Sequence, residues 1–464
     1  MSGDRERLAA VEEVVYGDGG SGAVRRVLYA VYVGAILAFT YGFTVVRGVL
    51  VTSDADWVRD TLVSWPAAGV VLGAAGLVLL VVHGAGSRRG PVVPPLPWVD
   101  HVATSAIDRA ASLREWWLVS GALVLAGATA VGAVVGGSLW ASGATGPPAL
   151  AIGVGGGLVL GLATALVWLG GQVGPTVVVG GHRDARWARP AQALRRLTLE
   201  GLRAQSVRST HLGGAVLSGD LRAARLEVAT PVRRGRRLRL RSHGPVLTVA
   251  ARDVLGLRRQ PASFAAGLVL VVPGAAAVAW GLVQPQVPAA VTVIAAAVLH
   301  LGVGTWSEGT RLLGDTLGTP RLSGLDVRTE AAAHLVVPGV LLVLAALGSG
   351  LVVWAAHPDT AVGAVGVVAW SVVTPVLLLG LTWVTSFRDR PRASGFTPQV
   401  GPMTIVIWYA RPVLFASLVV GLLTDRAGTA GSWGAPGTWL ALLAALAWWW
   451  GARSLSRTSQ AHRD

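Results

Sequence analysis

The chain has 464 residues, of which 53% are hydrophobic, and its formal net charge of +15 rests on 39 basic residues that are all arginine. Because the sequence contains neither lysine nor cysteine, it excludes a GxxxxGK[ST] ATP-binding loop, lysine Schiff bases, disulfides, thiolate metal sites and cysteine nucleophiles.

Ten apolar stretches have the length of about 20 residues that a helix needs to cross a bilayer. They cover residues 27–47, 64–83, 116–139, 148–170, 263–283, 286–305, 333–355, 361–385, 403–423 and 434–451. We therefore expect an all-α polytopic membrane protein with about ten transmembrane helices, and twelve as the upper limit.

Arginine is concentrated on one side of these spans. If the N-terminus is cytoplasmic and the sides alternate, 35 of the 39 arginines fall in inner segments. Only Arg47, Arg59 and Arg426 lie outside, and Arg411 lies within the ninth span. Because cytoplasmic loops carry the excess of positive charge, we expect a multi-pass protein of the cell membrane with both termini in the cytoplasm.

This topology predicts five regions along the chain. They are a cytoplasmic N-terminal segment (1–26), membrane helices 1–4 (27–180), a basic cytoplasmic segment (181–262), membrane helices 5–10 (263–451) and a cytoplasmic tail (452–464). The acidic start of the chain is unlike a signal peptide, so we expect the first apolar stretch to be an uncleaved span.

Few polar residues lie inside the spans. None of the ten contains Asp or Glu, which argues against a proton- or sodium-coupled carrier. His300 and Arg411 are the in-membrane polar candidates. For His300 the favoured interpretation is packing against a neighbouring helix. Arg411 either snorkels to the cytoplasmic surface, which is favoured, or faces an internal cavity.

Glycines recur at four-residue spacing in three spans, a pattern that lets helix backbones approach closely. The positions are Gly69 and Gly73, Gly132 and Gly136, and Gly153, Gly157 and Gly161. This pattern predicts close helix packing and carries no information about a substrate.

Carboxylates cluster in one outer loop, at Asp54, Asp56 and Asp60. Such a group can hold a divalent metal, as in membrane enzymes that use lipid-linked sugars. No His or further acid lies nearby to complete a coordination shell, so a solvated loop is the favoured interpretation. We expect no catalytic residues, no cofactor and no metal site.

The basic segment 181–262 holds 18 arginines and a net charge of +13, with six arginines in residues 233–241. Beside a membrane these charges are expected to attract anionic lipid headgroups rather than nucleic acid. At its end, apolar residues at 246, 247, 250, 254, 255 and 257 follow a helical period. They predict an amphipathic interfacial helix over 245–260, stopped by Pro261.

Residues 98–115, 245–262 and 306–332 resemble permease subunits of the ABC-2 exporter type, in which a basic interfacial helix of the form Arg-Asp…Leu-Arg-x-x-Pro leads into a span. The whole chain is similar to a family of permease-like membrane proteins from high-GC Gram-positive bacteria. The stretches that carry this likeness are Trp98-Val-Asp…Ile107-Asp-Arg-Ala, Ala333-His-Leu-Val-Val-Pro-Gly339 and Gly401-Pro-Met403. The chain departs from the pattern in its ten spans, because an ABC-2 half has six and a fused pair twelve.

The resemblance implies a permease subunit of an ATP-driven transporter, without enzymatic activity of its own, coupled to a separate ATP-binding subunit. Arg252, Asp253, Arg258 and Arg259 are then the candidate partner contacts, although they can equally serve only to seat the helix at the headgroups. A second copy or another permease is a further expected partner. The alternatives are a non-transporting scaffold or accessory subunit, a membrane enzyme acting on lipid-linked substrates, and a secondary carrier.

Overall fold

The computed structural model describes residues 6–8, 10, 22–51, 55–174, 189–217, 240, 244–317, 324–387 and 401–461. Within these ranges the regular structure is helical throughout and contains no strand, so the predicted all-α class is confirmed. The dense arginine run over 233–241 lies outside the described residues, apart from Leu240.

Eight helices in the described part of the chain are long and apolar enough to cross a membrane. They are α5 (Trp65–Gly86), α7 (Arg109–Ala141), α8 (Pro148–Val173), α13 (Pro261–Val283), α14 (Ala289–Trp306), α16 (Val327–Ala356), α17 (Gly363–Ser386) and α18 (Gly401–Thr429). Each coincides with a predicted span, so the chain has the character of a multi-pass membrane protein.

The first and last predicted spans are also helical but are not among these eight. The first is divided into α2 (Gly22–Leu37), the π-helical segment η2 (Ala38–Phe43) and α3 (Thr44–Val51), with a shorter apolar helix over Leu28–Thr40. The last is α19 (Gly434–Ala461), whose apolar part contains three consecutive tryptophans and whose last residues are polar. An indole ring carries a polar N–H and favours the membrane interface over the bilayer core.

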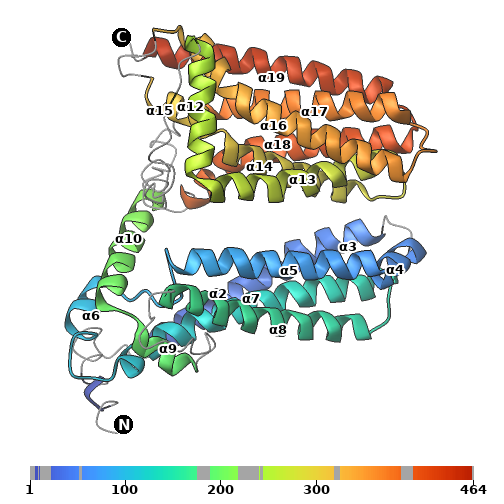
Figure 1. Ribbon diagram of the computed structural model, residues 1–464. Helices are drawn as coiled ribbons and strands as arrows, with labels where there is room; N and C mark the ends of the chain where they lie inside the picture. The colour runs from blue at the N-terminus through green and yellow to red at the C-terminus, as the bar shows by residue number, and fades with distance from the viewer. Residues whose placement is uncertain are drawn as a thin grey trace, which may run out of the picture. The chain divides into compact units, whose positions relative to one another are not determined.

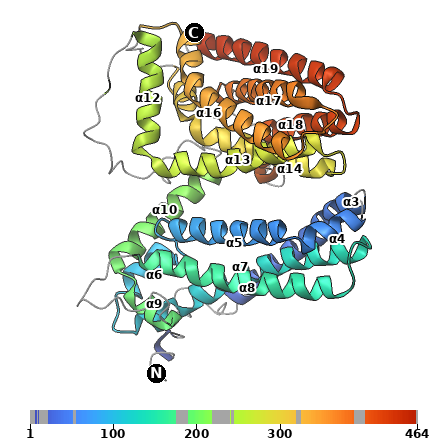
Figure 2. The same ribbon diagram turned by 45° about the vertical axis from the view of Figure 1, so that its right-hand side comes forward.

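The chain divides into two compact units, Met1–Ala229 and Thr230–Asp464. In the first unit α5, α7 and α8 run side by side (Figures 1 and 2). The short helices α6 (Leu96–His101) and α9 (Pro190–Arg196) and the longer α10 (Leu199–Leu217) gather at one end of them, whereas α4 (Ala55–Val63) lies at the other.

Helices α7 and α8 pack against each other through faces that carry glycines. A Cβ added at Gly157 would lie 2.5 Å from the Ala128 carbonyl oxygen, and one added at Gly132 would overlap the Gly153 carbonyl oxygen. These backbones therefore approach as closely as the spacing predicted. Gly155, on the same helix, has no neighbour within 4 Å.

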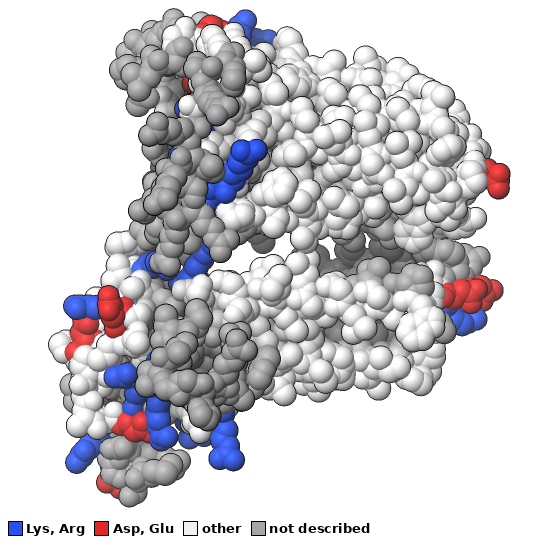
Figure 3. Space-filling model, in the orientation of Figure 1, with Lys and Arg blue, Asp and Glu red and all other residues white. Residues whose placement is uncertain are grey.

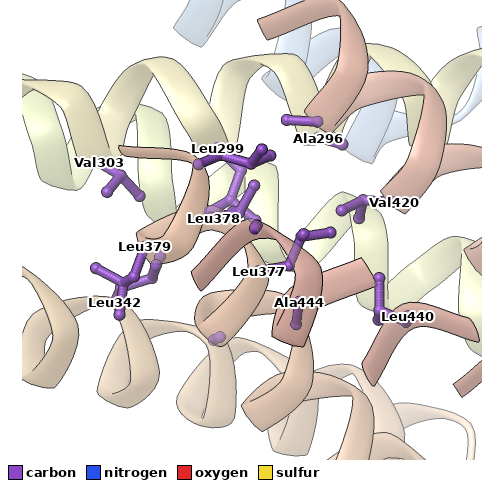
Figure 4. Packing of buried hydrophobic residues seen from close by; sticks show 14 of the residues in the cluster. Ala296, Leu299, Val303, Leu342, Leu377, Leu378, Leu379, Val420, Leu440 and Ala444 are labelled. Carbon is purple, nitrogen blue, oxygen red and sulfur yellow. The ribbon is translucent and has the colours of Figure 1, made fainter. Parts of the chain in front are cut away.

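The second unit is a bundle of α13, α14 and α16–α19, with α12 (Pro245–Arg259) lying across the helix ends (Figures 1 and 2). Figure 4 shows the bundle's interior, where aliphatic side chains of α14, α16, α17, α18 and α19 meet. Leu299, Leu342, Leu377 and Leu440 are all fully buried there. A helix that is apolar all round can face this core on one side and lipid on the other.

The wall of this bundle that is visible in Figure 3 is largely uncharged. Figure 3 shows a broad uncharged surface over the bundle helices, and basic side chains at the end of the unit that carries α12. The sequence-based topology assigns that end to the cytoplasm.

Candidate functional site

The helix α12 is held against the bundle by one face. Gly244 adopts φ +88° just before it, and Pro245 opens the helix at a position that needs no N–H donor. Val249 and Ala250 are buried, and Leu257 packs against the bundle core. The predicted helix over 245–260 is thus observed over Pro245–Arg259.

A buried polar pair fixes α12 to α16. His334 Nδ1 donates a hydrogen bond of 2.7 Å to Asp253 Oδ2, across 81 positions of sequence. The His334 side chain is 1% exposed and that of Asp253 is 10% exposed. An ionised carboxylate only accepts hydrogen bonds, so the geometry places the hydrogen on Nδ1 of the imidazole.

The short helix α15 (Glu308–Asp315) covers this pair. A Cβ added at Gly309 would lie 2.5 Å from Asp253 Oδ1 and would overlap His334 Nδ1. Glycine is therefore required at this point, because the α15 backbone passes directly over both side chains. Three helices that are separate in sequence, α12, α15 and α16, meet at the pair.

Further buried polar groups surround the pair. Glu330 lies four residues before His334 on α16, hence on the same helix face, and it is buried. Thr310 on α15 is fully buried. Within the described part of the chain, neither Thr310 Oγ1 nor His334 Nε2 has a hydrogen-bond partner. No described group of three or more His, Asp or Glu side chains is arranged to hold a metal ion.

The candidate arginines of α12 occupy two different faces. At 3.6 residues per turn, Arg252 and Arg259 share one face, whereas Arg258 continues the stripe of Leu247 and Val254. Arg252 and Arg258 are exposed, and Arg259 is half-buried. Asp253, the fourth candidate partner contact, is instead largely covered and paired with His334.

An apolar groove runs between α12 and α16 and has a volume of about 420 Å³. Eight aliphatic side chains line it: Leu247, Ala250, Ala251 and Val254 from α12, and Val336, Val337, Val340 and Leu341 from α16. Three of its lining residues, Leu247, Ala251 and Val254, lie on the face of α12 that carries Arg258.

The two in-membrane candidates belong to α14 and α18, not to the three helices that meet at the Asp253–His334 pair. His300 on α14 is buried, and its Nδ1 has no hydrogen-bond partner among the described groups. Arg411 is exposed on α18, and its guanidinium carbon lies 5.2 Å from the centre of the Trp408 ring. That spacing is within the range of a cation–π contact.

A second buried polar network lies in the first unit. Gln172 of α8 donates to the Val92 carbonyl oxygen at 2.7 Å and to Gln205 Oε1 of α10 at 3.0 Å. Gln172 Oε1 accepts from the Val92 N–H, and Gln205 Oε1 accepts from the Gly90 N–H. This network attaches the segment before α6 to α8 and α10. A glutamine at the end of an otherwise apolar span was the sequence signal for it.

The acidic stretch predicted to be an outer loop is helical in α4, where it forms an ion pair within the helix. Asp56 on α4 accepts a hydrogen bond of 3.0 Å from Arg59, three residues later. Both side chains are exposed. Asp54, the third carboxylate considered with Asp56 and Asp60, lies outside the described residues.

Neither His334 nor Gln172 was among the predicted site residues. His334 stands at the inner end of a predicted span and within the stretch 333–339 that carries the resemblance, and these were its signals in the sequence. Comparison with known protein families, curated proteins and solved structures finds no match to this chain.

Proposed function

We propose that this chain is the membrane-spanning permease subunit of an ATP-driven exporter of the ABC-2 type, with ATP hydrolysed by a separate subunit. The observation that carries the proposal is the attachment of α12 to α16 by the buried Asp253–His334 pair. An interfacial helix fixed to a membrane helix in this way transmits a push from a partner directly into the bundle.

The division into units supports the same proposal. The second unit contains α13, α14, α16, α17, α18 and α19, preceded by the basic helix α12. An ABC-2 half is expected to have six spans and a basic interfacial helix that leads into a span, so this arrangement supports the proposal. The spans that make the whole chain differ from the six or twelve of the ABC-2 pattern then lie in the first unit.

Arg252 and Arg259 are the proposed contacts for the ATP-binding subunit. They lie on the face of α12 opposite the exposed Leu247 and Val254. If those two apolar residues face lipid, the two arginines face the cytoplasm, where a soluble partner docks. Charged residues at the edge of an interface speed the association of two proteins and make that association depend on salt.

The test is affinity purification of the tagged full chain from native membranes in mild detergent. We expect a stoichiometric partner that bears a GxxxxGK[ST] loop, and its loss in the double variant Arg252→Glu, Arg259→Glu. Arg258→Glu is the matched control, because it makes the same charge change on another face of the helix. A chain that purifies without an ATP-binding partner contradicts the proposal.

A scaffold or accessory subunit is the second candidate. A Cβ added at Gly69 or Gly73 on α5 would have no neighbour within 4 Å, and in the most apolar 18-residue window of that span no described residue is buried within the chain. Small residues on a lipid-facing surface suit close contact with a partner helix. Reconstituted transport with the ATP-binding partner distinguishes the two functions, because a scaffold copurifies with other membrane proteins and moves no cargo.

A further inference from the structure

We propose that the α12–α16 groove binds one acyl chain of an anionic phospholipid, whose phosphate is held by Arg258. The inference does not depend on the proposed ATP-binding partner. It rests on the composition of the groove, on its length along α16 and on the position of the charge at its end.

The groove offers only hydrocarbon to its occupant. All eight lining side chains are aliphatic, and several remain accessible: Leu247 is 59% exposed, Val336 44% and Val340 53%. A volume of about 420 Å³ lies within the range of small-molecule sites. Burying a methylene group contributes about 0.8 kcal/mol, so an alkyl chain suits this surface better than any polar ligand.

The apolar surface continues along α16 toward the C-terminal end of that helix. Val336, Val340 and Leu344 recur every four residues on one face, and Leu344 is 63% exposed. This track covers about 12 Å at the helical rise. One leaflet of a hydrocarbon core is about 15 Å deep, so the track matches most of the depth that an acyl chain occupies.

The charge lies where a headgroup is expected. Arg258 follows Leu247, Ala251 and Val254 on the same stripe of α12, about 6 Å along the axis beyond Val254. Its side chain is exposed, and no described residue forms an ion pair with it. An arginine presents its N–H groups as a fork that fits a phosphate.

A lipid accounts for these features better than a protein segment. Both walls of the groove already belong to helices at the edge of a membrane bundle, where phospholipid is the most abundant apolar molecule. The apolar α12–α16 groove with Arg258 beside it is complementary to a molecule that has one anionic end and one alkyl end.

The test uses the purified full chain in vesicles that contain equal amounts of phosphatidylglycerol and phosphatidylcholine. In separate samples, one lipid or the other carries a photoactivatable group in its acyl chain. We expect crosslinks to α12 and α16 peptides that line the groove. Phosphatidylglycerol should label them about fivefold more than phosphatidylcholine, given the typical attraction between one arginine and an anionic headgroup.

Two variants separate the headgroup from the acyl chain. Arg258→Gln should reduce the fivefold preference to about one, whereas Arg252→Gln on the other face should preserve it. Val340→Trp fills the groove and should suppress labelling by both lipids. Val352→Trp, at an exposed position farther along α16, is its matched control.

Three results would overturn the inference. One is equal labelling by the two lipids in the unmodified chain. Another is groove labelling that Val340→Trp leaves unchanged. The third is a polypeptide crosslinked to the groove in native membranes, which would make the site a protein interface.

Discussion

Breaking the Asp253–His334 pair should release α12 from the bundle. In the variant Asp253→Ala, the Nδ1–H of His334 loses its acceptor while the ring stays 1% exposed. A hydrogen bond that involves a charged group contributes about 1.5–3 kcal/mol, and a buried donor left unpaired costs about 1–3 kcal/mol. We therefore expect the free energy of α12 undocking to fall by about 2 kcal/mol.

Replacing the histidine of the pair instead of the aspartate should lower the free energy of α12 undocking by a smaller amount. His334→Leu leaves the Asp253 carboxylate unpaired, but Asp253 is 10% exposed and gains access to water more easily. When both partners are replaced, neither buried group is left unpaired. The double variant should accordingly be less destabilised than the sum of the single variants, with an interaction energy of about 1–3 kcal/mol.

The opening of α12 can be measured by labelling a single introduced cysteine, because the sequence itself contains none. Val249 is buried on the packed face of α12, so Val249→Cys reacts with a maleimide only when α12 opens. When opening is fast compared with labelling, a loss of about 2 kcal/mol raises the labelling rate about 30-fold.

Arg252→Leu is the matched control, because it changes an exposed neighbour on the same helix and should alter the labelling rate less than twofold. Asp253→Asn retains an oxygen that accepts from Nδ1 and should give an intermediate rate. Equal rates for Asp253→Ala and Arg252→Leu would refute the reasoning, as would strict additivity in the double variant.

Three further predictions concern the first unit. Gly157→Val should separate α7 from α8 and cost about 1–3 kcal/mol, whereas Gly155→Val should be tolerated; equal thermal stability in detergent would contradict this. Arg195 hydrogen-bonds to Asp108 at 2.8 Å and lowers the pKa of that carboxyl. A carboxyl whose pKa is lowered by folding stabilises the folded state at pH values above its unfolded pKa of about 3.9. This stabilisation is lost as the pH falls through the folded-state pKa. Arg195→Gln should therefore lower the melting temperature slightly at pH 6, because the pair is partly exposed, and this difference from the unmodified chain should shrink as the pH falls and the Asp108 carboxyl is protonated. Gln172→Leu should cost about 1–3 kcal/mol by leaving the Val92 backbone unpaired; an unchanged melting temperature would exclude that role for the amide network.

The sequence determined the fold class because membrane insertion depends on the hydrophobicity of each segment taken alone. Apolar stretches of about 20 residues predicted the positions of all eight spanning helices, and Pro261 predicted the end of α12. The spacing of Gly132, Gly153 and Gly157 likewise predicted close helix approach, which the α7–α8 contact confirms.

Helical periodicity could not decide which face of α12 is packed. The apolar pattern grouped Leu247, Val254 and Ala250 together, but the structure buries Ala250 and leaves Leu247 and Val254 exposed. The period fixes which residues share a face, whereas the neighbouring helix decides which face is covered.

Only the tertiary structure brought Asp253 to His334 and placed Gly309 over both of them. Hydropathy and charge are properties of single positions, and the sequence states them directly. A hydrogen bond across 81 positions depends on how three helices pack at one end of a bundle. That packing arises from the shapes of many side chains at once, so the site became visible only in three dimensions.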